Sequence, residues 1–201
     1  MAGAKVLGRL TWLLAELVEL VPETPRVTSL VLHVPGWPGH RPGQHVDVRL
    51  TAEDGEELAR WNWDELRALP SETITRDIHC VTKWSKLDTT WEGVSIDTLL
   101  EGIEPGAAYV TAWSDGGYTT NLPFEDVTGG KAWVAFGYDG EPLDPEHGGP
   151  ARLLVPHLYF WKSAKWVNGL RLLDHDRPGF WESLGYHNLG DPWREERYWG
   201  D

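Results

Sequence analysis

Residues 77–86 read Asp77-Ile78-His79-Cys80-Val81-Thr82-Lys83-Trp84-Ser85-Lys86 and contain the only cysteine of the chain. The cysteine ends a stretch, 73–80, whose composition predicts a strand. Lys83 and Lys86 follow it closely, and nearby cations favour the thiolate form, which attacks carbon or binds a soft metal. A single cysteine excludes an internal disulfide and any multi-cysteine zinc or iron–sulfur site within this chain. Cys80 is therefore an inert core thiol, a nucleophile, or the sole protein ligand of a metal whose other ligands come from elsewhere.

The composition around this motif bounds the class of protein. The chain has 201 residues, 41% hydrophobic, with 13 tryptophans, which is typical of a globular protein of one domain, or one domain plus a small appendage. The net charge of −13 argues against nucleic acid and anionic membranes as partners. The stretches 83–86 and 152–171 are nevertheless basic, which indicates a small anionic ligand.

Targeting signals are not evident from the sequence. The apolar run 13–21 is interrupted by Glu16 and Glu19 and is too short for a membrane span, so we expect no membrane insertion. No small-residue cleavage site follows it, and a lone thiol suits a reducing compartment. We therefore expect a cytoplasmic protein.

Short strands and short helices alternate along the chain, which predicts an α+β protein. Helices are expected to begin at Asn62, which forms a capping box with Glu65, and at Ser95 and Phe180. Residues 51–60 are charged and are expected to form a turn or linker, whereas residues 12–20 fit either a helix or a strand. The expected strands are 27–34, 44–50, 73–80, 109–113, 132–138 and 151–155.

Two glycine-containing segments are candidate anion sites. In 114–121, which begins Ser114-Asp115-Gly116-Gly117, the glycines allow backbone amides to approach a ligand, although a plain hairpin turn explains the same residues. In 146–152, Arg152 follows a Gly-Gly-Pro loop and is placed to bind phosphate or carboxylate through its guanidinium fork. The alternative for Arg152 is a surface salt bridge.

The segment 160–166, Phe160-Trp161-Lys162-Ser163-Ala164-Lys165-Trp166, places small residues between lysines and tryptophans. This pattern fits an anion-binding nest with aromatic walls, and equally a helical turn with solvated lysines.

His79 beside Cys80 suggests a cysteine hydrolase. Neighbours on a strand point to opposite faces, however, so the base would have to be a distant histidine. The candidates for that base are His147, His157 and His187.

Taken together, these segments resemble the sulfite oxidase family of molybdopterin-dependent oxidoreductases from about residue 61 to residue 201. Within that family, the chain looks like the small bacterial members akin to the methionine-sulfoxide reductase catalytic subunit. The matching segments are Asp77 to Ser85, Gly116 to Pro123, His147 to Pro156 and Lys162 to Trp166.

This resemblance implies a sulfite-oxidase-type fold of mixed β-sheets with short helices and a molybdenum–molybdopterin cofactor. It implies a two-electron oxo transfer on a small, sulfur-centred substrate, with electrons exchanged through a flavin- or haem-containing partner protein. Cys80 would be the catalytic metal ligand. The residues implied to contact the cofactor are His79, Cys80, Ser114, Asp115, His147, Arg152, Ser163, Ala164 and Lys165.

The amino-terminal part follows a different pattern. Residues 11–55 resemble the start of a ferredoxin–NADP reductase-type flavin domain, but the chain continues with Glu56-Glu57-Leu58-Ala59-Arg60 where the flavin motif of that family is expected. We therefore predict an amino-terminal β segment over 1–55 and a molybdopterin-binding oxidoreductase domain over 56–201. Two other functions stay open: a cofactor-binding or electron-transfer module without catalysis of its own, and a hydrolase that uses Cys80.

Overall fold

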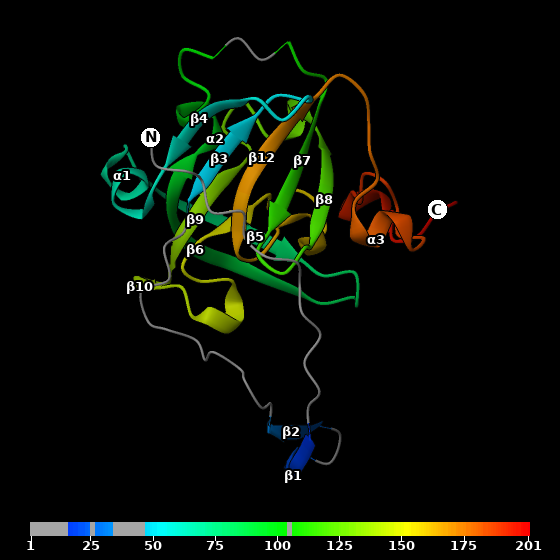
Figure 1. The fold of residues 1–201 in the computed structure, drawn as a ribbon. Helices are drawn as coiled ribbons and strands as arrows, with labels where there is room; N and C mark the ends of the chain where they lie inside the picture. The colour runs from blue at the N-terminus through cyan, green and yellow to red at the C-terminus, as the bar shows by residue number, and fades with distance from the viewer. Residues whose placement is uncertain (1–15, 25–26, 34–46, 104–105) are drawn as a thin grey trace. The chain divides into compact units, whose positions relative to one another are not determined.

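The computed structural model describes residues 16–24, 27–33, 47–103 and 106–201, and the chain divides into two compact units, 1–44 and 45–201. The first unit contains an antiparallel hairpin of β1 (Glu16–Thr24) and β2 (Val27–His33) (Figure 1). This confirms the strand predicted over 27–34 as far as residue 33, and it resolves the ambiguous stretch 12–20 as a strand from Glu16 onward.

One five-stranded sheet of the second unit mixes parallel and antiparallel pairs (Figure 1). β3 and β12 pair in parallel, and all other neighbours are antiparallel. In order across the sheet, its strands are β4 (Glu57–Trp61), β3 (Val48–Thr51), β12 (Val167–Leu173), β7 (Tyr109–Ser114) and β8 (Thr119–Pro123).

The expectation of a turn or linker over 51–60 is wrong in its second half. Residues Glu57–Trp61 form the edge strand β4, which pairs with β3. The residues of β4 are exposed or half-buried, and charged residues are common on edge strands because they discourage pairing with other chains. The charge pattern therefore described an edge strand rather than a loop.

The second sheet carries the cysteine motif. β5 (Glu72–His79) and β6 (Ser85–Ser95) form an antiparallel hairpin, and Cys80 is the first residue of its tip. β6 pairs in turn with β9 (Trp133–Tyr138), the central strand of this sheet. β9 also pairs with β10 (Glu141–Pro142) and β11 (Arg152–Leu154).

Both faces of β9 are buried, which explains its nearly continuous apolar sequence. Val134 and Phe136 belong to the main core, which combines apolar side chains of both sheets. Trp133 and Ala135 alternate with them and belong to a second cluster on β5, β6 and β11. The two sheets thus enclose one core, and the sheet that carries Cys80 buries a second.

The helices are short and start at the predicted residues. α1 (Trp63–Ala68) begins with the predicted capping box: Asn62 Oδ1 accepts from the Glu65 N–H at 3.0 Å, and Glu65 Oε2 accepts from the Asn62 N–H at 2.9 Å. The remaining helices are α2 (Ile96–Leu99) and α3 (Phe180–Ser183), with 3-10 turns at Phe124–Asp126, Pro145–His147, Phe160–Lys162 and Pro192–Arg194.

Mixed sheets joined by short helices confirm the predicted α+β class. None of the helices in the described ranges has the length and apolarity needed to cross a bilayer. β3 lies within the second unit, where it pairs with β4 and β12. The boundary predicted near residue 55, between the amino-terminal β segment and the molybdopterin-binding domain, stays a prediction.

Candidate functional site

A cavity of about 260 Å³ lies where the segment after β11 meets the turn between β7 and β8. Its wall combines two cations with five aromatic side chains. Four of the predicted cofactor contacts, Arg152, Ser163, Ala164 and Lys165, are brought together here. The full lining is Tyr118, Arg152, Phe160, Trp161, Ser163, Ala164, Lys165, Trp166 and Trp181.

Arg152 is the first residue of β11 and is only 2% exposed. Its Nη1 donates to the carbonyl of His147 and its Nη2 to the carbonyl of Ser163, both at 2.8 Å. The guanidinium carbon lies 4.1 Å from the centre of the Phe160 ring. Burial lowers the pKa of Arg152 to about 9, so the side chain is still a cation at neutral pH.

No carboxylate forms an ion pair with Arg152 among the residues that the structure describes, and its buried Nε has no hydrogen-bond partner there. A buried, uncompensated charge is costly, and an anion at this position would remove the cost. The predicted alternative for Arg152, a surface salt bridge, is therefore wrong.

Lys165 is the second cation of the cavity wall. Its Nζ donates to the backbone carbonyl of Glu146 at 2.6 Å. Burial, and then the neighbouring charge of Arg152, lowers the pKa of Lys165. Two cations that repel each other across one cavity make a site for an anion, because bound negative charge relieves both.

The segment from Ser163 to Lys165 runs beside β11. The Leu153 N–H donates to the Ala164 carbonyl at 2.8 Å, and the Val155 N–H donates to Ser163 Oγ at 2.9 Å. Ser163 and Ala164 are buried, and both line the cavity. The alternative of a helical turn with solvated lysines is wrong for Lys162, whose side chain is 0% exposed.

His147 takes part through its backbone rather than its ring. Its carbonyl holds Arg152, while its side chain is 62% exposed and lies outside the cavity lining. The next residue must be a glycine: Gly148 has φ +107°, and a Cβ there would lie 3.0 Å from Lys165 Cβ and 3.1 Å from Arg152 Cβ. The glycine thus lets the loop approach both cations.

Ser114 and Asp115 adjoin the cavity without lining it. The Asp115 N–H donates to the Trp166 carbonyl at 2.9 Å, which ties the β7–β8 turn to the cavity segment. Ser114 is buried, and its Oγ has no hydrogen-bond partner among the described residues. From the same turn, Tyr118 lines the cavity and donates to the Trp161 carbonyl at 2.5 Å.

Sequence reasoning predicted the aromatic walls formed by residues 160–166, but it missed the contributions of Tyr118 and Trp181. Tyr118 and Trp166 lie within the quoted motifs, so their position was a usable signal for the wall. Nothing local marks Trp181, because it reaches the cavity from the carboxyl-terminal segment.

Cys80 is half-buried at the tip of the β5–β6 hairpin. Its Sγ accepts from Thr82 Oγ1 at 3.1 Å, and it lies outside the lining of the Arg152 cavity. The preceding residue, His79, forms a β-bridge with Tyr159, which is followed directly by the cavity residue Phe160. The hairpin tip is therefore connected by hydrogen bonds to the segment that builds the cavity.

His79 points to a different environment. Its Nδ1 lies 2.8 Å from Ser85 Oγ, and its ring centre lies 5.2 Å from that of Trp193. It lines a second cavity, of about 440 Å³, together with Arg76 and Trp133. The structure thus does not bring His79 to the Arg152 cavity.

A cysteine–histidine pair is absent from the described part of the chain. Thr82 is the hydrogen-bond partner of Cys80 Sγ there. His157 Nε2 lies 3.0 Å from Asp126, and His187 Nδ1 accepts from the Gly190 N–H at 3.1 Å. The hypothesis of a cysteine hydrolase therefore lacks the histidine that would act as the general base for Cys80.

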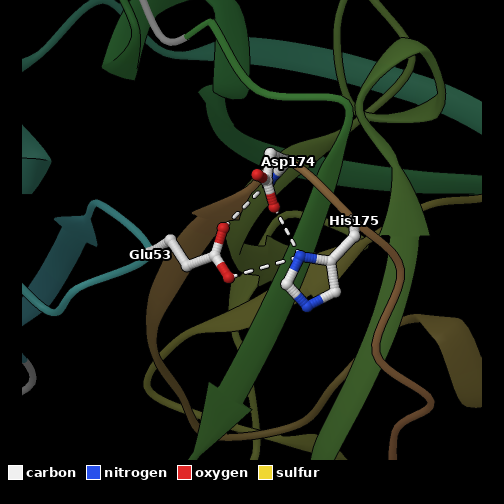
Figure 2. A group of neighbouring side chains, drawn as sticks. All are labelled: Glu53, Asp174 and His175. Carbon is white, nitrogen blue, oxygen red and sulfur yellow. Dashed lines mark hydrogen bonds and ion pairs between the residues drawn. The ribbon is translucent and has the colours of Figure 1, made fainter.

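Apart from the two cavities, the structure contains a cluster of side chains that could bind a metal ion, formed by Glu53, Asp174 and His175 (Figure 2). The charges of this cluster are already compensated within the protein. His175 Nδ1 lies 3.3 Å from Glu53 Oε1 and hydrogen-bonds to Asp174, which lowers the pKa of that carboxyl. Arg177 ion-pairs with Glu53 at 2.5 Å and donates to His175 Nε2 at 3.1 Å. The cluster is an ion-pair network that joins the β3–β4 turn to the segment after β12.

Comparison with known proteins shows which protein family this chain belongs to. Residues 32–181 match the family described as "Oxidoreductase molybdopterin binding domain". The chain belongs to this family of molybdopterin-binding oxidoreductases. It is also 41% identical over 162 residues to the "Uncharacterized oxidoreductase YuiH" of Bacillus subtilis (strain 168), covering 73% of this chain and 82% of that protein.

Two further proteins to which the chain is similar are longer than it. The chain is 32% identical over 133 residues to the "Putative protein-methionine-sulfoxide reductase subunit YedZ1" of Azospira oryzae, covering 65% of this chain and 50% of that one. Among solved structures it resembles the sulfane dehydrogenase SoxCD of Paracoccus pantotrophus, with a TM-score of 0.58, 21% identity, and coverage of 80% of this chain and 51% of that one. This likeness confirms the predicted sulfite-oxidase-type fold, and the chain spans about half of each of these two proteins.

The residues of the cavity fit a molybdopterin. The cofactor carries an anionic phosphate, and the cavity offers the uncompensated cations Arg152 and Lys165. The unpartnered Arg152 Nε and Ser114 Oγ are buried polar atoms that need hydrogen-bond partners. Molybdenum is a metal for which a soft thiolate is a suitable ligand, and Cys80 supplies one thiol.

Proposed function

We propose that this oxidoreductase performs a two-electron oxo transfer on a small, sulfur-centred substrate. The single observation that carries the proposal is the buried guanidinium of Arg152, which faces a cavity without a carboxylate partner in the described residues. The likeness to proteins named methionine-sulfoxide reductase supports a sulfur-centred substrate. The direction of electron flow depends on whether the substrate is oxidised or reduced, and the turnover assay below tests both directions.

In this proposal the cations hold the phosphate end of the cofactor. Arg152 and Lys165 neutralise it, and Ser163 and Ala164 present small side chains so that the backbone can approach. The His147 carbonyl orients Arg152 by its 2.8 Å hydrogen bond. Ser114 and Asp115 contribute from the β7–β8 turn, where Ser114 Oγ has no other partner in the described residues.

At the reactive end, Cys80 would be the protein's ligand to molybdenum. Thr82 Oγ1 holds its sulfur at 3.1 Å, and His79 anchors the hairpin tip through Ser85. When bound, the cofactor supplies the two-electron redox chemistry. The protein would bind and orient it, with the aromatic side chains lining the cavity around it.

We further propose that a flavin- or haem-containing protein exchanges electrons with this enzyme in a reducing, cytoplasmic compartment. The presence of a single cysteine supports the compartment, because the chain cannot form an internal disulfide and does not depend on oxidising conditions. The relative named as a subunit of a methionine-sulfoxide reductase supports a partner protein.

Metal analysis of the chain and of Cys80→Ser tests the proposal. We expect about one molybdenum atom per chain in protein from a host that makes the cofactor, and turnover of a sulfoxide or sulfite with an artificial electron carrier. In Cys80→Ser, turnover should vanish while the pterin stays bound, because the phosphate site is intact. Val81→Ala, at the neighbouring residue, is the matched control and should keep turnover.

Two outcomes would count against the proposal in different ways. Wild-type protein without molybdenum would refute it. Wild-type protein that binds the pterin but turns over neither substrate class would favour the cofactor-binding or electron-transfer module.

A further inference from the structure

The cavity wall extends into the segment 178–190, most of which lies beyond the match to the family at residue 181. Trp181, in α3, is a lining residue of the cavity. α3 contacts β8, beside which it lies in Figure 1. The carboxyl-terminal segment thus helps to complete the cofactor site.

A buried ion pair fastens this segment. Lys162 Nζ lies 2.7 Å from Glu182 Oε1, and the two side chains are 0% and 1% exposed. Lys162 also donates to the carbonyls of Asn121 at 2.8 Å and Asn188 at 2.6 Å. All three donor positions of the ammonium are thereby used, so Lys162 is satisfied within the protein and is not available to the cofactor.

Glu182 connects the ion pair to the cavity wall. Its Oε1 accepts not only from Lys162 but also from the indole N–H of Trp161 at 2.9 Å and from Thr120 Oγ1 at 3.1 Å. Trp161 and Trp181, which precedes Glu182 in sequence, both line the cavity. One carboxylate oxygen therefore holds Trp161 directly, and its residue belongs to the same short helix as Trp181.

The ring of Trp161 is packed tightly from the same segment. A Cβ at Gly190 would lie 2.7 Å from Trp161 Cζ2, and the ring centres of Trp161 and Tyr186 are 5.1 Å apart. The Tyr159 N–H donates to the Gly190 carbonyl at 2.7 Å. The indole is thus held at its nitrogen by Glu182, it stacks on the ring of Tyr159, and Tyr186 and Gly190 pack closely against it.

We propose that Glu182 is a positioning residue for the cofactor, which it serves by holding Trp161 and Trp181 as the outer wall of the cavity. This inference rests on the proposed placement of the cofactor in this cavity. A buried ion pair often adds little to stability compared with apolar residues of the same size. Its value here is geometric, because Lys162 makes it possible to keep a carboxylate buried beside the indole N–H.

The test measures how fast the loaded enzyme releases its pterin, from the fluorescence of the free pterin. Lys162→Met/Glu182→Leu removes the acceptor of the indole N–H and Trp161→Phe removes its donor, so each should speed release about tenfold, the effect of losing one hydrogen bond to a charged group. When the two changes are combined, their effects should not add, because both remove the same contact. Glu195→Gln, whose side chain is 76% exposed, is the matched control and should leave the rate unchanged.

A variant with an apolar pair separates positioning from folding. Lys162→Met/Glu182→Leu leaves no buried charge unpaired, so it should still unfold cooperatively and bind pterin, yet release it faster. Unchanged release in this variant, or effects that add when it is combined with Trp161→Phe, would overturn the proposal.

The placement of the cofactor has its own control. If Arg152→Lys also leaves release unchanged, the cofactor does not occupy this cavity and the proposed site fails. If Arg152→Lys speeds release and the Glu182 variants do not, only the role of Glu182 fails.

Discussion

Arg152 Nη2 donates to the backbone carbonyl of Ser163 at 2.8 Å, across eleven residues of chain. This contact joins the start of β11 to the segment that closes the cavity, and it fixes the guanidinium without neutralising it. The charge stays available to an anion because both acceptors of the guanidinium, the carbonyls of His147 and Ser163, are uncharged. Two of the four segments quoted for the family resemblance, His147 to Pro156 and Lys162 to Trp166, thus form one structural unit.

Arg152→Lys should weaken cofactor binding although it conserves the charge. Lysine lacks the planar fork that bonds both carbonyls, so the cation would lose its fixed position. We expect cofactor affinity to fall about 10- to 100-fold, measured as pterin content after dialysis. Arg171→Lys, on β12, is the control and should keep full content; equal content in both variants would contradict the role of Arg152.

The affinity of the cofactor-free protein for anions should fall as the pH rises. The pKa of Arg152 is lowered to about 9, so the anion-binding protonated form dominates below pH 9 and is lost as pH rises through it. Sulfate affinity by calorimetry should be flat from pH 7 to about pH 9 and then fall by up to about tenfold per pH unit, because sulfate itself does not titrate in this range. The lowered pKa of Lys165 acts in the same direction. Affinity that stays constant to pH 10.5 would contradict this assignment.

Gly148→Ala should destabilise the loop more than a comparable change elsewhere. Gly148 and Gly116 both have positive φ, +107° and +85°, so alanine is strained at either position. Only at Gly148 would the new methyl group press on Lys165 and Arg152. Urea unfolding should show an extra loss of about 1–3 kcal/mol at Gly148. Equal losses at the two glycines would show that the contact is absent.

Asn62→Ala should cost about 1 kcal/mol of unfolding free energy, because it removes the side chain that caps α1. Asn62→Asp keeps an acceptor for the Glu65 N–H and should retain most of the stability. Chemical denaturation of both variants measures the difference. Turnover should be unchanged in both variants, since α1 supplies no residue to the cavity. A drop in turnover with normal stability would contradict the expectation that the cap of α1 affects stability alone.

Local patterns were sufficient for much of the fold. The composition of residues 73–80 predicted β5, and the nearly continuous apolar run predicted β9, because both sides of that strand are buried. The capping box at Asn62 was readable because its partner lies three residues away. β4 was missed, since an exposed edge strand has a charge pattern that also suits a loop.

The sequence by itself determined the family resemblance, the α+β class, and the cations and small residues that meet in one cavity. These features depend on contacts over a few residues or on ordered motifs. Only the tertiary structure decided that Lys162 is buried rather than solvated, since its partner Glu182 lies twenty residues further along the chain. It also decided that His79 turns to Ser85 and Trp193, and that Trp181 joins the cavity wall. The physical reason is that burial and charge compensation are set by side chains that folding brings together from distant segments.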